Sequence, residues 1–130
     1  MRFYSAGNMY LSSIQQGIQA FHCLGEMTLE HTGNKMFEDW LSIHKTLICI
    51  NGGNNESLNA LYELLKESDY PVAKFHEDNA SMGGMLTCVG IIVPEKIYST
   101  DISDVESALA VLTPIEFTVA SALKRMPLAR

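Results

Sequence analysis

Over residues 12–27 (SSIQQGIQAFHCLGEM), polar and apolar residues follow two neighbouring rows with helical spacing. Side chains three and four positions apart share one side of a helix. The polar row is Gln15, Gln19, His22 and Glu26, and the apolar row is Ile14, Ile18, Phe21 and Gly25. We expect a helix, capped by Ser12 or Ser13 and ending near Thr32, that packs its apolar row on a sheet. Its polar row is then either a face for chemistry or an ordinary solvated face.

The rest of the chain alternates between strand-like and helix-like segments. Apolar runs of strand length occur at residues 2–6, 46–51, 71–77 and 87–97. Helical spacing occurs at residues 35–44, 56–68, 103–112 and 114–126, and Thr113 before Pro114 is typical of a helix start. This order predicts an α/β fold: one three-layer domain with a four-stranded mixed sheet, helices on both faces and two extra C-terminal helices.

Composition favours a single domain in a reducing compartment. The 130 residues, 47% of them hydrophobic, fit one globular unit over residues 1–130. Because the chain has no apolar run of about 18 residues and no signal-like segment at its start, we expect a cytoplasmic protein without a membrane span. Cys23, Cys49 and Cys88 lie in apolar runs without a CxxC pair, so we expect buried thiols and no metal site.

The acidic balance argues against a protein that binds a long nucleic acid. The net charge is −6, whereas such binding uses a surplus of basic residues to neutralise phosphates. Basic residues cluster once, at Lys124, Arg125 and Arg130. That cluster either binds a phosphate or complements the negative end of the last helix.

Three segments are expected to meet at the carboxyl ends of the strands, where ligands bind in α/β sheets. They are residues 7–13, 52–55 and 76–79. The glycine turn Gly52–Gly53 matches no phosphate-binding fingerprint and is interpreted as an ordinary turn. The third segment carries His76, Glu77 and then Asp78 and Asn79, which form either a ligand-binding loop or a solvated turn.

A series of short motifs runs along the chain. In order, the motifs are SSIQQGIQAFHC, a tryptophan, KTLICINGG, a helix, PVAKFHEDN and TCVGIIVPE. Together they resemble the type II peptidyl-tRNA hydrolase family, particularly its short bacteriophage-type members. The resemblance covers about residues 2–97. The family carries the pattern KxAAQxSHA on its first helix and an aspartate at the end of its third strand. That register sets Gln19 on the glutamine, His22 on the histidine and Glu77, or else Asp78, on the aspartate. The family's lysine falls on Gln15, its Thr-Asp pair on Gly7 and Asn8, and its serine on Phe21.

The resemblance implies hydrolysis of the ester between a peptidyl group and the 3′ end of tRNA. His22 or Glu77 would orient the water, and Gln19 with Gln15 would donate hydrogen bonds. Neither a metal nor a cofactor is implied. The ligand contacts implied around these residues are Gln15, Asn8, Ser13, Asp78, Asn79 and Thr87. Gln15 supplies no positive charge where the family has a lysine, which predicts weakened or lost catalysis.

Two alternatives belong to other classes of protein. The first is a non-catalytic pocket that binds or sequesters a small nucleotide, in the host cytoplasm if a bacteriophage encodes the chain, for instance against a defence signal. The second is a homodimeric interaction module that pairs through its terminal helices. The apolar residues expected on that dimer face are Ala108, Val111, Leu112, Ile115, Val119 and Leu123.

Overall fold

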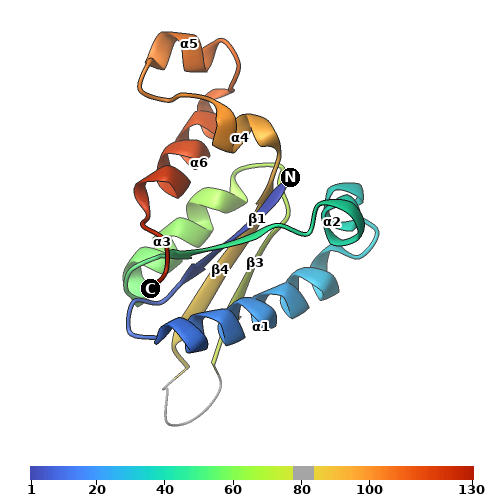
Figure 1. The fold of residues 1–130 in the computed structure, drawn as a ribbon, viewed down its shortest axis with the longest axis vertical. Coiled ribbons are helices and arrows are strands. Elements are labelled where there is room, and N and C mark those ends of the chain that lie inside the picture. Colours follow the sequence, from blue (N-terminus) through green and yellow to red (C-terminus); the bar gives the residue numbers. More distant parts are fainter. Residues whose placement is uncertain (78–83) are drawn as a thin grey trace.

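Four strands form one mixed sheet in the order β2-β1-β4-β3 (Figure 1). In the computed structural model, which describes residues 1–77 and 84–130, they are β1 (Arg2–Gly7), β2 (Leu47–Asn51), β3 (Val72–His76) and β4 (Leu86–Val93). β1 and β2 are parallel, and β4 is antiparallel to both β1 and β3. The carboxyl ends of β1, β2 and β3 therefore lie at one edge of the sheet, as the sequence predicted.

One face of the sheet is covered by α1 (Ser13–His31), α2 (Lys35–Asp39) and the π-helical turn η1 (Trp40–His44). Ser12 is the N-cap of α1, in a capping box with Gln15. Trp40 is 4% exposed and its indole N–H donates to the carbonyl of Thr46 at 2.8 Å. The core on this face consists of Phe3, Cys23, Met27, Phe37, Trp40, Ala73, Cys88 and Ile92.

The opposite face is covered by α3 (Asn55–Lys66) and α6 (Pro114–Arg125), with α4 (Glu95–Ser99) and α5 (Val105–Leu109) beside α6 (Figure 1). The larger core lies here, between β4 and these helices. After α6 the chain returns along β2, where Asn51 N–H donates to the carbonyl of Pro127 and Ala129 N–H to that of Cys49. The C-terminal residues thereby pair with the outer edge of β2.

The prediction that the apolar row of α1 packs on the sheet is wrong. Ile14, Ile18 and Phe21 are 78%, 49% and 71% exposed. The residues of α1 that are buried are Gln16, Gln19, Ala20, Cys23 and Met27.

Close approach of α1 to β4 explains this choice of face. A Cβ at Gly90 would lie 2.8 Å from Cys23 Sγ, so the helix crosses the sheet directly over this glycine. At this point of closest approach a small side chain such as Cys23 fits between the helix and the strand, whereas a side chain as large as Ile18 or Phe21 would hold the helix away.

Two further segments differ from the sequence prediction. The strand expected over residues 87–97 ends at Val93, and Pro94 is the N-cap of α4. Proline lacks the N–H that a strand needs for its ladder but is tolerated at a helix start. Three helices follow β4 in the described residues instead of two, and α5 is shorter than the expected 103–112.

Most of the apolar residues expected on a dimer face of the terminal helices are buried. Ala108, Leu112, Val119 and Leu123 are at most 5% exposed, and the last three belong to the larger core. Val111, at 56%, is exposed, but it does not form a row with the others. Four of the six residues named for that face are thus unavailable to a partner in this conformation, and self-association stays a prediction.

The three cysteines are free thiols, but the expectation that all three are buried is wrong for Cys49, which is half-buried. Cys23 and Cys88 are buried, and Ser5 Oγ lies 2.8 Å from Cys88 Sγ. A hydrogen bond with Cys88, together with burial, raises the pKa of Cys23. Both thiols therefore act as small core side chains.

Candidate functional site

Three polar side chains from distant parts of the sequence meet at the carboxyl edge of the sheet. Gln19 of α1 donates from Nε2 to Glu77 Oε2 at 3.5 Å, and its Oε1 accepts from Thr87 Oγ1 of β4 at 2.9 Å. Glu77 follows β3 directly, and its N–H donates to the carbonyl of Met85. Gln19 and Thr87 are 7% and 0% exposed, and Glu77 is half-buried. We call these three residues the Gln19 cluster.

The carboxylate of Glu77 determines how the Gln19 amide is oriented. If the amide were reversed, its oxygen would face the carboxylate, and two acceptors would repel each other. In the observed orientation the oxygen takes the hydroxyl proton of Thr87, which also lies 3.2 Å from the carbonyl oxygen of Phe75. The Gln19 amide therefore donates one N–H to a carboxylate oxygen of Glu77, and its second N–H can donate to another acceptor.

His22 lies one turn further along α1 and packs on the same strand end. Its ring stacks on Phe75 with centroids 4.7 Å apart and an interplanar angle of 14°, and Phe21 meets it edge-on at 6.1 Å. The side chain of His22 is exposed, so its ring nitrogens remain accessible to solvent. The structure thus brings His22 next to the strand that carries Glu77.

Gln15 and Ser13 lie at the exposed start of α1. The Gln15 side-chain oxygen accepts from Ser12 N–H at 2.9 Å, and its backbone N–H donates to Ser12 Oγ at 3.2 Å. Gln15 is thus part of the cap that starts the helix. Ser13 is the first residue of α1 and is exposed.

Asn8 connects the turn after β1 to β4. It is fully buried, donates from Nδ2 to the carbonyl of Leu86 at 3.0 Å and accepts from Tyr10 N–H at 3.1 Å. Its backbone N–H donates to the carbonyl of Thr87. These contacts place Asn8 beneath the edge of the sheet, where it holds Thr87 in register. Asp78 and Asn79 lie outside the described residues.

Gln16 is a buried polar residue that sequence reasoning missed. It is 4% exposed, Nε2 donates to the carbonyl of Leu11, and Oε1 has no hydrogen-bond partner among the described residues. That oxygen would lie 2.9 Å from a Cβ at Gly7. The spacing of residues 16, 20, 23 and 27 is helical, but the polarity of Gln16 hides this row in the sequence.

A hollow of about 410 Å³ lies beside the same edge, lined by Gly52, Gly53, Ser57 and Arg125 among others. Gly53 has φ of +83°, a conformation that favours glycine, and Ser57 Oγ donates to the carbonyl of Gly52. Gly52 N–H donates to the carbonyl of Gly7, so this turn is tied to the end of β1. The side chain of Arg125 thus brings positive charge close to the carboxyl edge.

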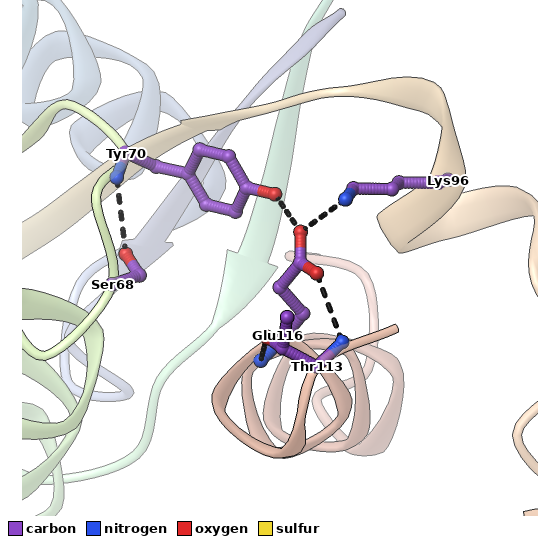
Figure 2. Close-up of polar contacts among 5 residues, drawn as sticks. All are labelled: Ser68, Tyr70, Lys96, Thr113 and Glu116. Atoms are coloured by element: carbon purple, nitrogen blue, oxygen red, sulfur yellow. Dashed lines mark hydrogen bonds and ion pairs between the residues drawn. The ribbon is translucent and has the colours of Figure 1, made fainter. Parts of the chain in front are cut away.

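A second polar cluster, around Glu116, has a structural role (Figure 2). One oxygen of Glu116 accepts from Lys96 Nζ at 2.6 Å and from the hydroxyl of Tyr70, and the other accepts from Thr113 N–H at 2.9 Å. Burial alone would raise the pKa of Glu116, but these hydrogen bonds outweigh it and hold the pKa at about 2. Burial and the contact with Glu116 raise the pKa of Tyr70. The carboxylate is fully used in joining α6 to α4 and to the turn before β3.

Two classes of site are not found within residues 1–77 and 84–130. No group of three histidine, cysteine, aspartate or glutamate side chains there has the arrangement of a metal site. No helix in this part of the chain is long and apolar enough to cross a membrane.

Neither a protein-family model nor a curated protein matches the chain.

Proposed function

We propose that the chain hydrolyses the ester between a peptidyl or aminoacyl group and the 3′-terminal ribose of tRNA. The observation that carries the proposal is the contact of Gln19 with both Glu77 and Thr87 at the carboxyl edge of the sheet. The resemblance of the sequence predicts a glutamine and an acidic residue as partners in this reaction. Their meeting across 58 positions of sequence supports it.

In the proposed reaction Glu77 is the general base. Its carboxylate takes a proton from a water molecule as the water oxygen adds to the ester carbonyl. The remaining N–H hydrogen of Gln19 donates to the developing oxyanion. When the tetrahedral intermediate collapses, the bond to the ribose oxygen breaks and that oxygen receives the proton. The products are the free carboxylic acid and tRNA with a 3′ hydroxyl group.

The charge distribution restricts the proposed substrate contact to the tRNA end. A net charge of −6 repels an extended polyanion, and Gln15 is neutral where the family has a lysine. Arg125 is the basic residue that lines the hollow beside the Gly52–Gly53 turn, at the carboxyl end of β2. We therefore propose that one terminal phosphate approaches Arg125 and that the acceptor stem makes few further ionic contacts.

Hydrolysis of peptidyl-tRNA by the purified chain tests the proposal directly. Glu77→Gln keeps the shape of the side chain but removes the base, so kcat/KM should fall at least about 100-fold. The matched control is Glu63→Gln on the exposed face of α3, which removes the same charge and should keep wild-type activity. No turnover by the wild-type chain, or equal activity of the Glu77 variant, would contradict the proposal.

Neutral Gln15 specifically favours a second candidate, a pocket that binds a nucleotide without cleaving it. Hydrogen-bond recognition by amides needs no lysine, whereas stabilisation of an oxyanion gains from one. Native mass spectrometry of the purified chain distinguishes the two. A bound nucleotide without hydrolysis of peptidyl-tRNA would support this candidate over the first.

A further inference from the structure

The outer side of α1 carries an apolar row that no other part of residues 1–77 and 84–130 covers. Ile14, Ile18, Phe21 and Leu29 are 78%, 49%, 71% and 79% exposed, and Gly25 lies in the same row. We call these five residues the outer α1 stripe. Figure 1 shows α1 at the outside of the fold, with the sheet behind it. Isolated exposed apolar residues are common, but a continuous row of them over four helical turns marks an interaction surface.

Two glycines on the exposed side of α1 pack against no other residue that the structure describes. A Cβ at Gly17 or Gly25 would meet nothing within 4 Å. A glycine inside a helix is destabilising relative to alanine. Since the fold itself does not require a glycine at position 25, the hollow that it leaves in the stripe is available to a side chain from outside.

We propose that two copies of the chain associate through the outer α1 stripe, with their helices antiparallel about a two-fold axis beside Phe21 and His22. In this register Ile18 of each copy packs into the hollow at Gly25 of the other, and Ile14 of each meets Leu29. The same contacts are thus made twice, as a two-fold interface requires. Ile18 and the hollow at Gly25 lie at equal distances from the two-fold axis, on opposite sides of it. The stripe is therefore complementary to a second copy of itself.

Charge also favours the antiparallel arrangement. Glu26 flanks the stripe, and in this antiparallel register it lies level with Gly17 of the other helix, one turn from the start of that helix. The neighbouring first turn has no acidic residue and carries the positive end of the helix dipole. Parallel pairing would instead set Glu26 against its own copy. Because each chain carries a net charge of −6, association should strengthen as salt is added.

The size of the stripe predicts a weak dimer. Its exposed side chains provide on the order of 500 Å² per chain, whereas stable complexes bury about 800 Å² per partner. A dissociation constant on the order of 1 to 100 μM follows.

Sedimentation equilibrium of the full chain across this concentration range measures the association. We expect the mass to rise from 14.4 kDa toward twice that value. Phe21→Glu should keep the chain monomeric, whereas the control Ile43→Glu, at a residue 70% exposed on η1, should leave the dimer intact. A chain that is monomeric at every concentration, or a dimer that survives Phe21→Glu, overturns the proposal.

The variant Gly25→Leu distinguishes an effect on dimer association from an effect on the stability of the monomer. Leucine has a higher helix propensity than glycine, so the monomer should resist urea better, yet the filled hollow should weaken association at least tenfold. If Gly25→Leu strengthens the dimer, the proposed register is overturned.

Cross-linking tests the orientation. In a Cys49→Ala background, Ile18→Cys mixed with Gly25→Cys should give a disulfide-linked heterodimer on oxidation, while Ile18→Cys alone should not link to itself. Preferential self-linking of Ile18→Cys would indicate another register and contradict the proposal. A dimer dissociated by Val111→Glu would place the interface on the terminal helices instead. None of these outcomes depends on whether the chain hydrolyses an ester.

Discussion

At position 87 a single hydroxyl group connects β4 to α1. Thr87 Oγ1 lies 2.9 Å from the side-chain oxygen of Gln19 and 3.2 Å from the carbonyl oxygen of Phe75. Since Thr87 is fully buried, it cannot itself touch a substrate in this conformation. Its role in the proposed reaction is that of a positioning residue, which keeps the Gln19 amide turned toward Glu77.

Thr87→Val removes this hydroxyl and keeps the shape of the side chain. We expect kcat for peptidyl-tRNA hydrolysis to fall about 10- to 100-fold, because the amide loses its fixed orientation, with KM little changed. Thr87→Ser retains the hydroxyl and should recover most of the activity. The control Thr118→Val, at an exposed position of α6, should have no effect. If Thr87→Val lowers the stability of the fold but does not lower kcat while leaving KM unchanged, the role of Thr87 is purely structural.

Among the helices, α1 and α6 differ in how much of their placement can be predicted from their own sequences. Both helices begin with a complete capping box, Ser12 with Gln15 and Thr113 with Glu116. The start of α6 was therefore predictable from Thr113 and Pro114 alone. The direction in which α1 faces was not, because its sequence contains two rows with helical spacing and the sheet selects between them.

The cap of α6 gives a prediction for stability. Thr113→Ala removes the acceptor for Glu116 N–H but keeps the backbone N–H that donates to the Glu116 carboxylate. The free energy of unfolding in urea should fall by about 1 kcal/mol. Thr118→Ala, in the middle of the same helix, should cost less than half as much. Equal losses in the two variants would show that the cap contributes nothing specific.

For the whole molecule, the Glu116 cluster links three segments and makes stability depend on pH. The folded-state pKa of Glu116 is about 2, below its ordinary value of 4.5. A carboxyl group with a lowered pKa stabilises the fold above its unfolded-state pKa, and this contribution is lost as pH falls toward the folded-state pKa. Stability should therefore decline between about pH 4.5 and 2.

Glu116→Gln tests that dependence. The variant should be less stable than the wild-type chain at pH 7, and the difference between them should shrink as the pH approaches 2. Glu63→Gln, at an exposed position, should instead follow the wild-type curve. Urea unfolding at several pH values gives the measurement. A constant difference between Glu116→Gln and wild type across this range would contradict the assignment.

Local sequence determined which segments form helices and strands. Apolar runs, helical spacing, the serine and threonine caps and Pro114 act over a few residues, so they can be recognised without the fold. They predicted strands that end at residues 6, 51 and 77, within one residue of the observed ends at Gly7, Asn51 and His76, and therefore the edge where the polar residues gather. Proline at position 94 was the signal that β4 stops at Val93, and the prediction overlooked it.

Tertiary structure alone decided which face of α1 is buried and which polar groups meet. The approach of the helix to Gly90 admits Cys23 but would not admit a side chain as large as Ile18 or Phe21, a restriction that arises only when the helix lies on β4. The same packing turns Gln19 inward to Glu77 and Thr87 and leaves the outer α1 stripe in water. Helical spacing is identical for both faces, so the volume available above the sheet, rather than the pattern of the sequence, made the choice.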